Sequence, residues 1–390
     1  MWTPGVPADG HGAAVRRRPP FSMPPKSYRY CFAAYRGQGG PSLGHFAADL
    51  DLGPAAEWGR FTALRRWLNP ELAAEAEPRI APIWHASAGA PYVEGLRVTL
   101  RAKAMPTITT DIPSSFFRPK AMRLGNTLVA QKKIASGELF TYAVLAFPIS
   151  ADAERQDPDP LQIEELPVPM ALAPGSIEDE LTQAAAFGDV GSGQMPVFVP
   201  QATLDEALTL AERAGHVELG AVLIGKMHRD ARSRELFLKV TALIPARHTL
   251  SESAKVTFTA ETWAAVQAAL SLRGAGEQFV GWMHNHPGAP HWCKKECSPE
   301  AKLRCLFNTP FFSSADCDLH RVGFSQAHCV ALLVTGTFSG LKITMYGWDR
   351  AQIVQRGFYI TNPDAARRLP EPQTASIINS DIHETTCTNS

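Results

Sequence analysis

The chain has 390 residues, 45% of them hydrophobic and 19% charged, which is enough for two or three domains with a sizeable core. Lys and Arg together number 38, and so do Asp and Glu, so the balanced charge argues against nucleic acid or an anionic membrane as a partner. No apolar run is long enough to span a membrane, and Pro19-Pro20 stands where a signal peptide would be apolar. We therefore expect a cytoplasmic protein.

The first part of the chain divides into three segments. Residues 1–27 are rich in Pro, Gly and Arg without periodicity, which predicts a disordered extension. Residues 28–150 are expected to form an α+β domain of unknown function. Its predicted elements are a helix over 58–76 that breaks at Pro70, and strands over 96–100, 127–130 and 139–145. Repeated Pro and Gly predict a linker over 151–195, with a short helix at 177–186.

A second domain is expected over residues 196–362. Apolar strands alternate with amphipathic helices there, which predicts an α/β fold. The predicted strands cover 197–199, 217–227, 236–244, 278–286, 330–334 and 341–346, and the predicted helices cover 204–211, 259–270 and 316–326. The polar residues 363–390 are expected to form a disordered tail.

Two histidines end the strand predicted over 278–286. The period of two in a strand places His284 and His286 on one face, with Asn285 facing away, and Pro287 stops the strand. A later carboxylate, Asp316, offers a third ligand. Two imidazoles and one carboxylate suit a catalytic zinc that keeps one position open for water. The alternative is a surface or hydrogen-bonded histidine pair without a metal.

Hydrolysis at such a zinc also requires a carboxylate that moves protons. Glu218 is the candidate, because it begins an apolar strand where an ionised side chain costs free energy unless it has a partner. The alternative is a strand-end residue that faces solvent. Ser313, three residues before Asp316, could donate to a developing oxyanion, or could cap a helix as Ser-x-x-Asp does; both roles are compatible.

In this order, Glu218 to Gly225, His284-Asn285-His286-Pro287 and Ser313-Ser314-Ala315-Asp316 resemble the JAMM/MPN+ (JAB) metalloprotease family, over about residues 196–350. The resemblance implies an MPN/JAB domain, a mixed sheet flanked by helices. It also implies zinc bound by His284, His286 and Asp316, with Glu218 as general base and acid and Ser313 stabilising the oxyanion.

The resemblance further implies a deubiquitinase-like isopeptidase or peptidase that cleaves after the C-terminus of a ubiquitin-like protein. Bacterial members accompany ubiquitin-like conjugation systems, including Bil-type antiphage systems. Partners would be the ubiquitin-like protein and its conjugates, and enzymes like the activating and conjugating enzymes; a dimer is plausible by analogy. Two alternatives remain: a non-catalytic MPN scaffold, and a zinc peptidase acting on a sulfur-carrier protein.

One departure from the family is a Cys-rich insert over residues 288–312, between the second histidine and Ser313. Seven cysteines, an odd number, argue against a disulfide framework. Four of them fall between 293 and 317, which suggests a second, structural zinc. Its ligands would be Cys293, Cys297, Cys305 and one of His291, Cys317 and His320. The alternative is reduced cysteines in a loop that shapes the substrate channel.

Overall fold

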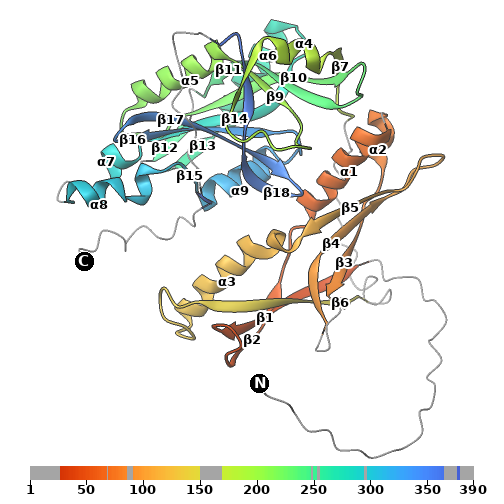
Figure 1. Ribbon diagram of the computed structural model, residues 1–390, viewed down its shortest axis with the longest axis vertical. Coiled ribbons are helices and arrows are strands. Elements are labelled where there is room, and N and C mark those ends of the chain that lie inside the picture. Colours follow the sequence, from red (N-terminus) through yellow and green to blue (C-terminus); the bar gives the residue numbers. More distant parts are fainter. Residues whose placement is uncertain are drawn as a thin grey trace, which may run out of the picture.

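The computed structural model describes residues 27–67, 69–85, 91–149, 169–246, 249–252, 255–293, 297–363 and 376–377. These residues form a mixed α/β structure with several sheets (Figure 1). No helix within these ranges is long and apolar enough to cross a membrane. The disordered ends predicted over 1–27 and 363–390 lie almost wholly outside the described residues, so their disorder stays a prediction.

Residues 28–148 build two antiparallel sheets, ordered β2-β1-β6 and β3-β4-β5. The strands are β1 (Tyr28–Arg36), β2 (Ser42–Ala48), β3 (Arg79–His85), β4 (Tyr92–Leu100), β5 (Ile108–Pro113) and β6 (Phe140–Pro148). The helices are α1 (Gly53–Trp67), α2 (Pro70–Glu75), the 3-10 helix η1 (Ser114–Phe117) and α3 (Arg118–Ala130). The predicted break at Pro70 is confirmed: Pro70 starts α2, and the Asn69 side chain caps it by accepting the N–H of Leu72.

The strand predicted over 127–130 is wrong, because these residues are the last turn of α3. Ala121, Leu124 and Leu128 are buried at helical spacing, and Pro119 lies in the first turn, where a missing N–H costs nothing. The run Thr127 to Ala130 is apolar but short, and short apolar runs do not distinguish a strand from a buried helix turn.

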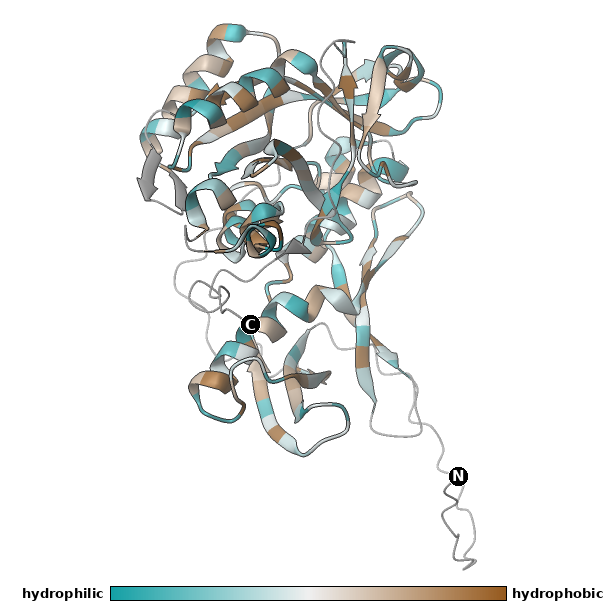
Figure 2. Ribbon diagram, turned by 60° about the vertical axis from the view of Figure 1, so that its left-hand side comes forward, coloured by the Kyte–Doolittle hydropathy of each residue, from teal (hydrophilic) through white to brown (hydrophobic). Residues whose placement is uncertain are grey.

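The candidate functional region is organised around a ten-stranded mixed sheet in the described part of the chain. Its order is β18-β17-β16-β14-β10-β11-β9-β19-β8, with β7 paired to the far end of β10. Its strands are β7 (Leu172–Gly175), β8 (Ala184–Phe187), β9 (Val197–Pro200), β10 (Gly220–Asp230), β11 (Leu236–Pro245), β14 (Gln278–His286), β16 (Val330–Thr337), β17 (Gly340–Asp349), β18 (Gln352–Arg356) and β19 (Phe358–Thr361). Apolar stretches, brown in Figure 2, recur along these strands. β14 lies in the interior of this sheet, antiparallel to β10 and parallel to β16.

The helices and smaller strands of this region flank the sheet (Figure 1). They are α4 (Ile177–Thr182), α5 (Gln201–Ala214), α6 (Ala260–Arg273), α7 (Ala289–Trp292), α8 (Pro299–Leu303), the 3-10 helix η3 (Leu306–Asn308), α9 (Ser314–Gly323) and the strand pairs β12 (Thr249–Glu252) with β13 (Lys255–Phe258) and β15 (Phe311–Phe312) with β20 (Ser376–Ile377). Thr259 caps α6 at its start, and Gly274 ends it in the left-handed conformation, at φ 58°.

The predicted linker differs from the structure in its second half. β7 pairs with β10 and β8 pairs with β19, so residues 172–175 and 184–187 belong to the large sheet. The helix predicted over 177–186 ends at Thr182. β7 and β8 are four residues each and lack an apolar alternation, so only their distant partners, not their own sequence, define them as strands.

The N-terminal sheets and the large sheet contact each other through charged side chains. Arg65 of α1 lies 2.7 Å from Glu235, and Arg123 of α3 lies 2.5 Å from Asp318 of α9. Glu57 of α1 accepts the N–H of Ala327, and burial raises the pKa of its carboxyl. These contacts place the two regions against each other, while the domain boundaries stay a prediction.

Candidate metal centre

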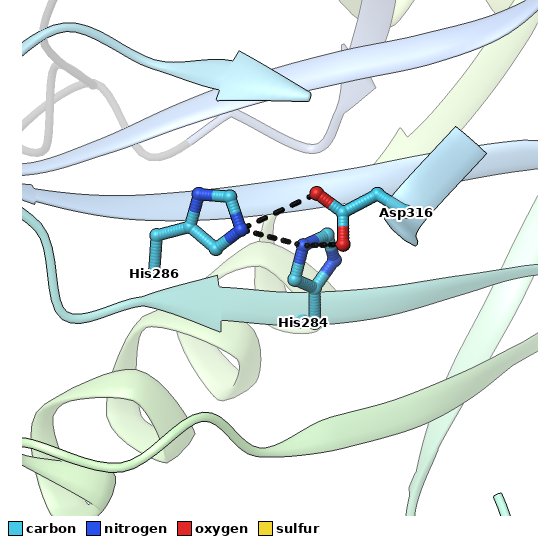
Figure 3. Close-up of side chains that lie close together, drawn as sticks. All are labelled: His284, His286 and Asp316. Carbon is cyan, nitrogen blue, oxygen red and sulfur yellow. Dashed lines mark hydrogen bonds and ion pairs between the residues drawn. The ribbon is translucent and has the colours of Figure 1, made fainter. Parts of the chain in front are cut away.

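The end of β14 brings two histidines to one point. His284 and His286 leave the same face of the strand, and their Nε2 atoms lie 3.1 Å apart (Figure 3). His284 is fully buried and His286 is 3% exposed, and β14 is paired with β10 on one edge and with β16 on the other. The expectation that both imidazoles converge is confirmed, and the alternative of a surface pair is wrong.

Asp316, in the first turn of α9, faces the two imidazoles. Its Oδ1 lies 3.2 Å from His284 Nε2, and its Oδ2 lies 3.4 Å from His286 Nε2. Ser313 and Asp316 form a reciprocal cap: Asp316 Oδ2 accepts the N–H of Ser313 at 2.8 Å, and Ser313 Oγ accepts the N–H of Asp316 at 3.1 Å. The cap fixes the direction of the carboxylate, so the helix start itself aims Asp316 at the histidines.

These three side chains fit a metal ion, and no other set of three His, Cys, Asp or Glu in the described ranges does. One ligand atom from each residue lies within 4.8 Å of the others, and the two imidazole Nε2 atoms are 3.1 Å apart, close to the roughly 3.3 Å between ligands of a tetrahedral site with bonds of about 2.0 to 2.1 Å. Burial raises the pKa of Asp316, but the two histidines hold it well below its usual range, so the carboxylate is ionised. Two nitrogen lone pairs and an anion directed at one point favour a cation there.

Aromatic rings enclose the centre. Trp282 stacks on His284 with ring centroids 4.4 Å apart, and Phe311 and Trp292 lie 4.8 and 5.5 Å from the His286 ring. Trp292 and Phe311 come from the segment between the second histidine and Ser313. An apolar wall lowers the local dielectric and strengthens every charge interaction inside it.

Glu218 lies beside this group, two residues before β10 begins. Its carboxylate Oε1 is 3.8 Å from His286 Nε2, and the residue is 3% exposed, so a solvent-facing strand end is excluded. Burial raises the pKa of Glu218 to about 7; the His286 charge opposes this and the Asp316 charge adds to it. A carboxyl with this pKa can both accept and release a proton near neutral pH.

Asn285 holds the backbone on both sides of Glu218, a role the sequence did not indicate. Its Oδ1 accepts the N–H of Leu219 at 2.6 Å, and its Nδ2 donates to the carbonyl of Val217 at 3.0 Å. Its own N–H donates to the carbonyl of Leu219 at 3.2 Å. Asn285 does face away from the imidazoles, as expected, but its side chain is 2% exposed and clamps the peptide groups flanking Glu218. The available signal was an amide, which carries both an acceptor oxygen and a donor NH2 group, between two ligand histidines.

The residues proposed for a second zinc are not gathered in the same way. Within the described residues, no group of three potential ligands that contains any of Cys293, Cys297 and Cys305 meets the geometry of a metal site. The three candidates for the fourth ligand lie in different surroundings, and the second zinc stays a prediction.

His320 and Cys317 belong to the aromatic cluster around Trp282. The Trp282 indole donates to His320 Nδ1 at 3.0 Å, and burial lowers the pKa of His320 to about 3. Cys317 packs against the same cluster, and burial raises the pKa of its thiol to about 12. His291 is exposed, with its ring 6.5 Å from that of His216. His291 is the most accessible of the three, because Cys317 is partly buried and His320 is buried.

No protein-family model matches the chain, and no curated protein matches it. Among solved structures, one that matches is the solution structure of a protein from Desulfitobacterium hafniense, at 16% sequence identity. The match covers 48% of this chain and 99% of that one with a TM-score of 0.25, and a likeness at this level carries no argument. The geometry of the site therefore carries the functional argument.

Proposed function

We propose that this protein is a JAMM-type zinc metalloprotease with an MPN domain and a separate N-terminal domain. It would remove a ubiquitin-like protein from its targets or process the C-terminus of its precursor. The observation that carries the proposal is the buried carboxyl of Glu218 next to the ligand set of His284, His286 and Asp316. A metal-binding scaffold without catalysis has no need of a fourth, proton-accepting group held there at a cost in free energy.

Each residue has a defined part in such a reaction. His284, His286 and Asp316 would hold the ion, which supplies an activated water at neutral pH and polarises a carbonyl group. Glu218, whose Oε1 lies 3.8 Å from His286 Nε2, would accept a proton from the water and deliver it to the leaving amine. The hydroxyl of Ser313 accepts from the helix cap and still has a hydrogen to donate, which suits a developing oxyanion.

The segment between the histidines and Ser313 supplies the wall on the substrate side. Trp292 contacts Phe307 and Phe311, with ring centroids 5.4 and 6.4 Å apart, and these rings surround His286. The insert would therefore shape the substrate channel whether or not its cysteines hold a second ion. Aromatic rings on this side of the centre favour an apolar peptide tail as the substrate.

The test compares Glu218→Gln with the wild type on a panel of ubiquitin and ubiquitin-like proteins that carry a fluorogenic C-terminal amide. We expect loss of at least about 100-fold in turnover, with zinc content unchanged by atomic emission, because only the proton carrier is lost. Glu212→Gln, on the exposed face of α5, is the matched control and should behave as wild type.

Three results would redirect the proposal. Equal turnover in wild type and Glu218→Gln would remove Glu218 from the reaction. Zinc binding with no hydrolysis of any probe by the wild type would favour the scaffold, and cleavage confined to a sulfur-carrier substrate would favour that peptidase. The partner enzymes of a conjugation system remain proposals that rest on the same assignment.

A further inference from the structure

Strand β15 occupies a distinctive place beside the metal centre. Its two residues, Phe311 and Phe312, directly precede Ser313 and the cap that aims Asp316. The Phe311 ring lies 4.8 Å from His286, and the Phe312 ring lies 6.0 Å from His284. A chain that pairs with β15 therefore lies next to the ligand set.

The strand that pairs with β15 comes from this chain's own C-terminal region. β20 runs parallel to β15, with Phe311 opposite Ser376 and Phe312 opposite Ile377. Within the described residues, β15 and β20 form a sheet of their own, apart from the large sheet. β15 thus has no other strand partner there, and its backbone groups would form an open edge without β20.

The direction and composition of the pairing fit a peptide tail. Because β20 is parallel to β15, its chain advances in the direction in which β15 leads to Ser313. An occupant therefore points its C-terminal side toward the metal centre, as a modifier whose C-terminal bond is cut would. The sequence over 373–380 carries no charge, which suits the apolar wall formed by Phe307 and Trp292.

We propose that the open edge of β15 is a docking site for an extended peptide, and that this chain's own segment around Ser376 and Ile377 is its resident occupant. Backbone pairing supplies the affinity, as in other cases where a peptide adds a strand to a sheet edge. The segment would then compete with any substrate tail for the same edge. The inference deepens the proposed function, because it rests on that function for the identity of the competing substrate.

The experiment uses the full chain with zinc bound. Ser376→Pro combined with Ile377→Pro removes both N–H groups of β20, while Thr385→Pro combined with Thr386→Pro is a matched control in the same tail. The probe is a fluorescein-labelled peptide with the sequence of residues 370–382. We expect the first variant to bind it at least about ten-fold more tightly than the wild type, since the edge is vacated, and the control to bind it as the wild type does.

Hydrogen exchange shows whether the loss of β20 exposes the backbone of β15. The backbone amides of Phe311 and Phe312 should exchange faster in the variant with proline at 376 and 377, and adding the unlabelled peptide should restore their protection. Unchanged exchange together with unchanged peptide affinity would overturn the inference. If the fluorogenic modifiers are cleaved, the same variant should raise kcat/KM by lowering KM; cleavage with identical kinetics in both variants would overturn the competition. Peptide binding without any cleavage would leave the docking site standing and refute the protease.

Discussion

The clamp that Asn285 forms on Glu218 gives the sharpest prediction. Asn285→Ala removes the acceptor of the Leu219 N–H and the donor to the Val217 carbonyl, at 2.6 and 3.0 Å. Each hydrogen bond contributes about 0.5 to 1.5 kcal/mol, so the free energy of unfolding should fall by about 1 to 3 kcal/mol. The bond from the Asn285 N–H to Leu219 is retained, so β14 should keep its place.

The larger effect is expected on the reaction. Without the clamp, the two peptide groups around Glu218 lose their anchor, and a displacement of about 1 Å of a catalytic group costs about 100-fold in rate. The ligand side chains are untouched, so zinc content should stay at the wild-type level. The measurements are urea unfolding of the metal-free chain, zinc content, and kcat and KM on the fluorogenic modifiers.

Asn285→Asp is a second variant that tests the same clamp. Asp keeps the acceptor for the Leu219 N–H, but it cannot donate to the Val217 carbonyl and places an anion against it. It should reduce kcat at least as far as Asn285→Ala, with KM nearly unchanged. A loss of stability of the expected size with kcat unchanged in both variants would show that Glu218 is positioned by other contacts, and would refute the reasoning.

Three further outcomes follow from the structure. His284→Ala should reduce the zinc content by about one ion per chain, as measured by atomic emission, because the remaining two ligands do not close a site. In the metal-free chain, burial raises the pKa of Glu218 to about 7. Above about pH 4 the carboxyl ionises in the unfolded chain but stays protonated in the folded chain, so the free energy of unfolding falls as the pH rises through 7. Glu218→Gln should therefore be more stable than wild type at pH 8, by at most about 3 kcal/mol, and not at pH 4; equal urea midpoints at both pH values would contradict this. Gly288→Ala should lower the melting temperature, since Gly288 has φ +68° and a Cβ there would lie 2.0 Å from the carbonyl oxygen of Gly336.

The elements carrying the ligands were predictable because their signals are local. The apolar run that leads to the two histidines defines β14 over 278–286 as predicted, and Ser313 to Asp316 is a helix cap by composition alone. The strand predicted over 127–130 was wrong, because a four-residue apolar run does not distinguish a strand from a helix turn.

What the sequence could not show depends on pairing between distant segments. β7 and β8 are strands only because β10 and β19 lie beside them. The clamp of Asn285 on the residues flanking Glu218 spans 66 and 68 positions of the chain. Contacts of this kind are set by the register of neighbouring strands, which a single sequence does not specify.

The candidate site lies in the interior of a large sheet, and this affects how the metal ion can be removed and replaced. Its ligands are already oriented by strand pairing and a helix cap, whereas a zinc finger unfolds when its ion is withdrawn. Chelation should thus yield a stripped but intact fold, ready to be refilled. One preparation can then be reconstituted with cobalt, cadmium or manganese in turn, so that ion preference is read by spectroscopy without renaturing the chain.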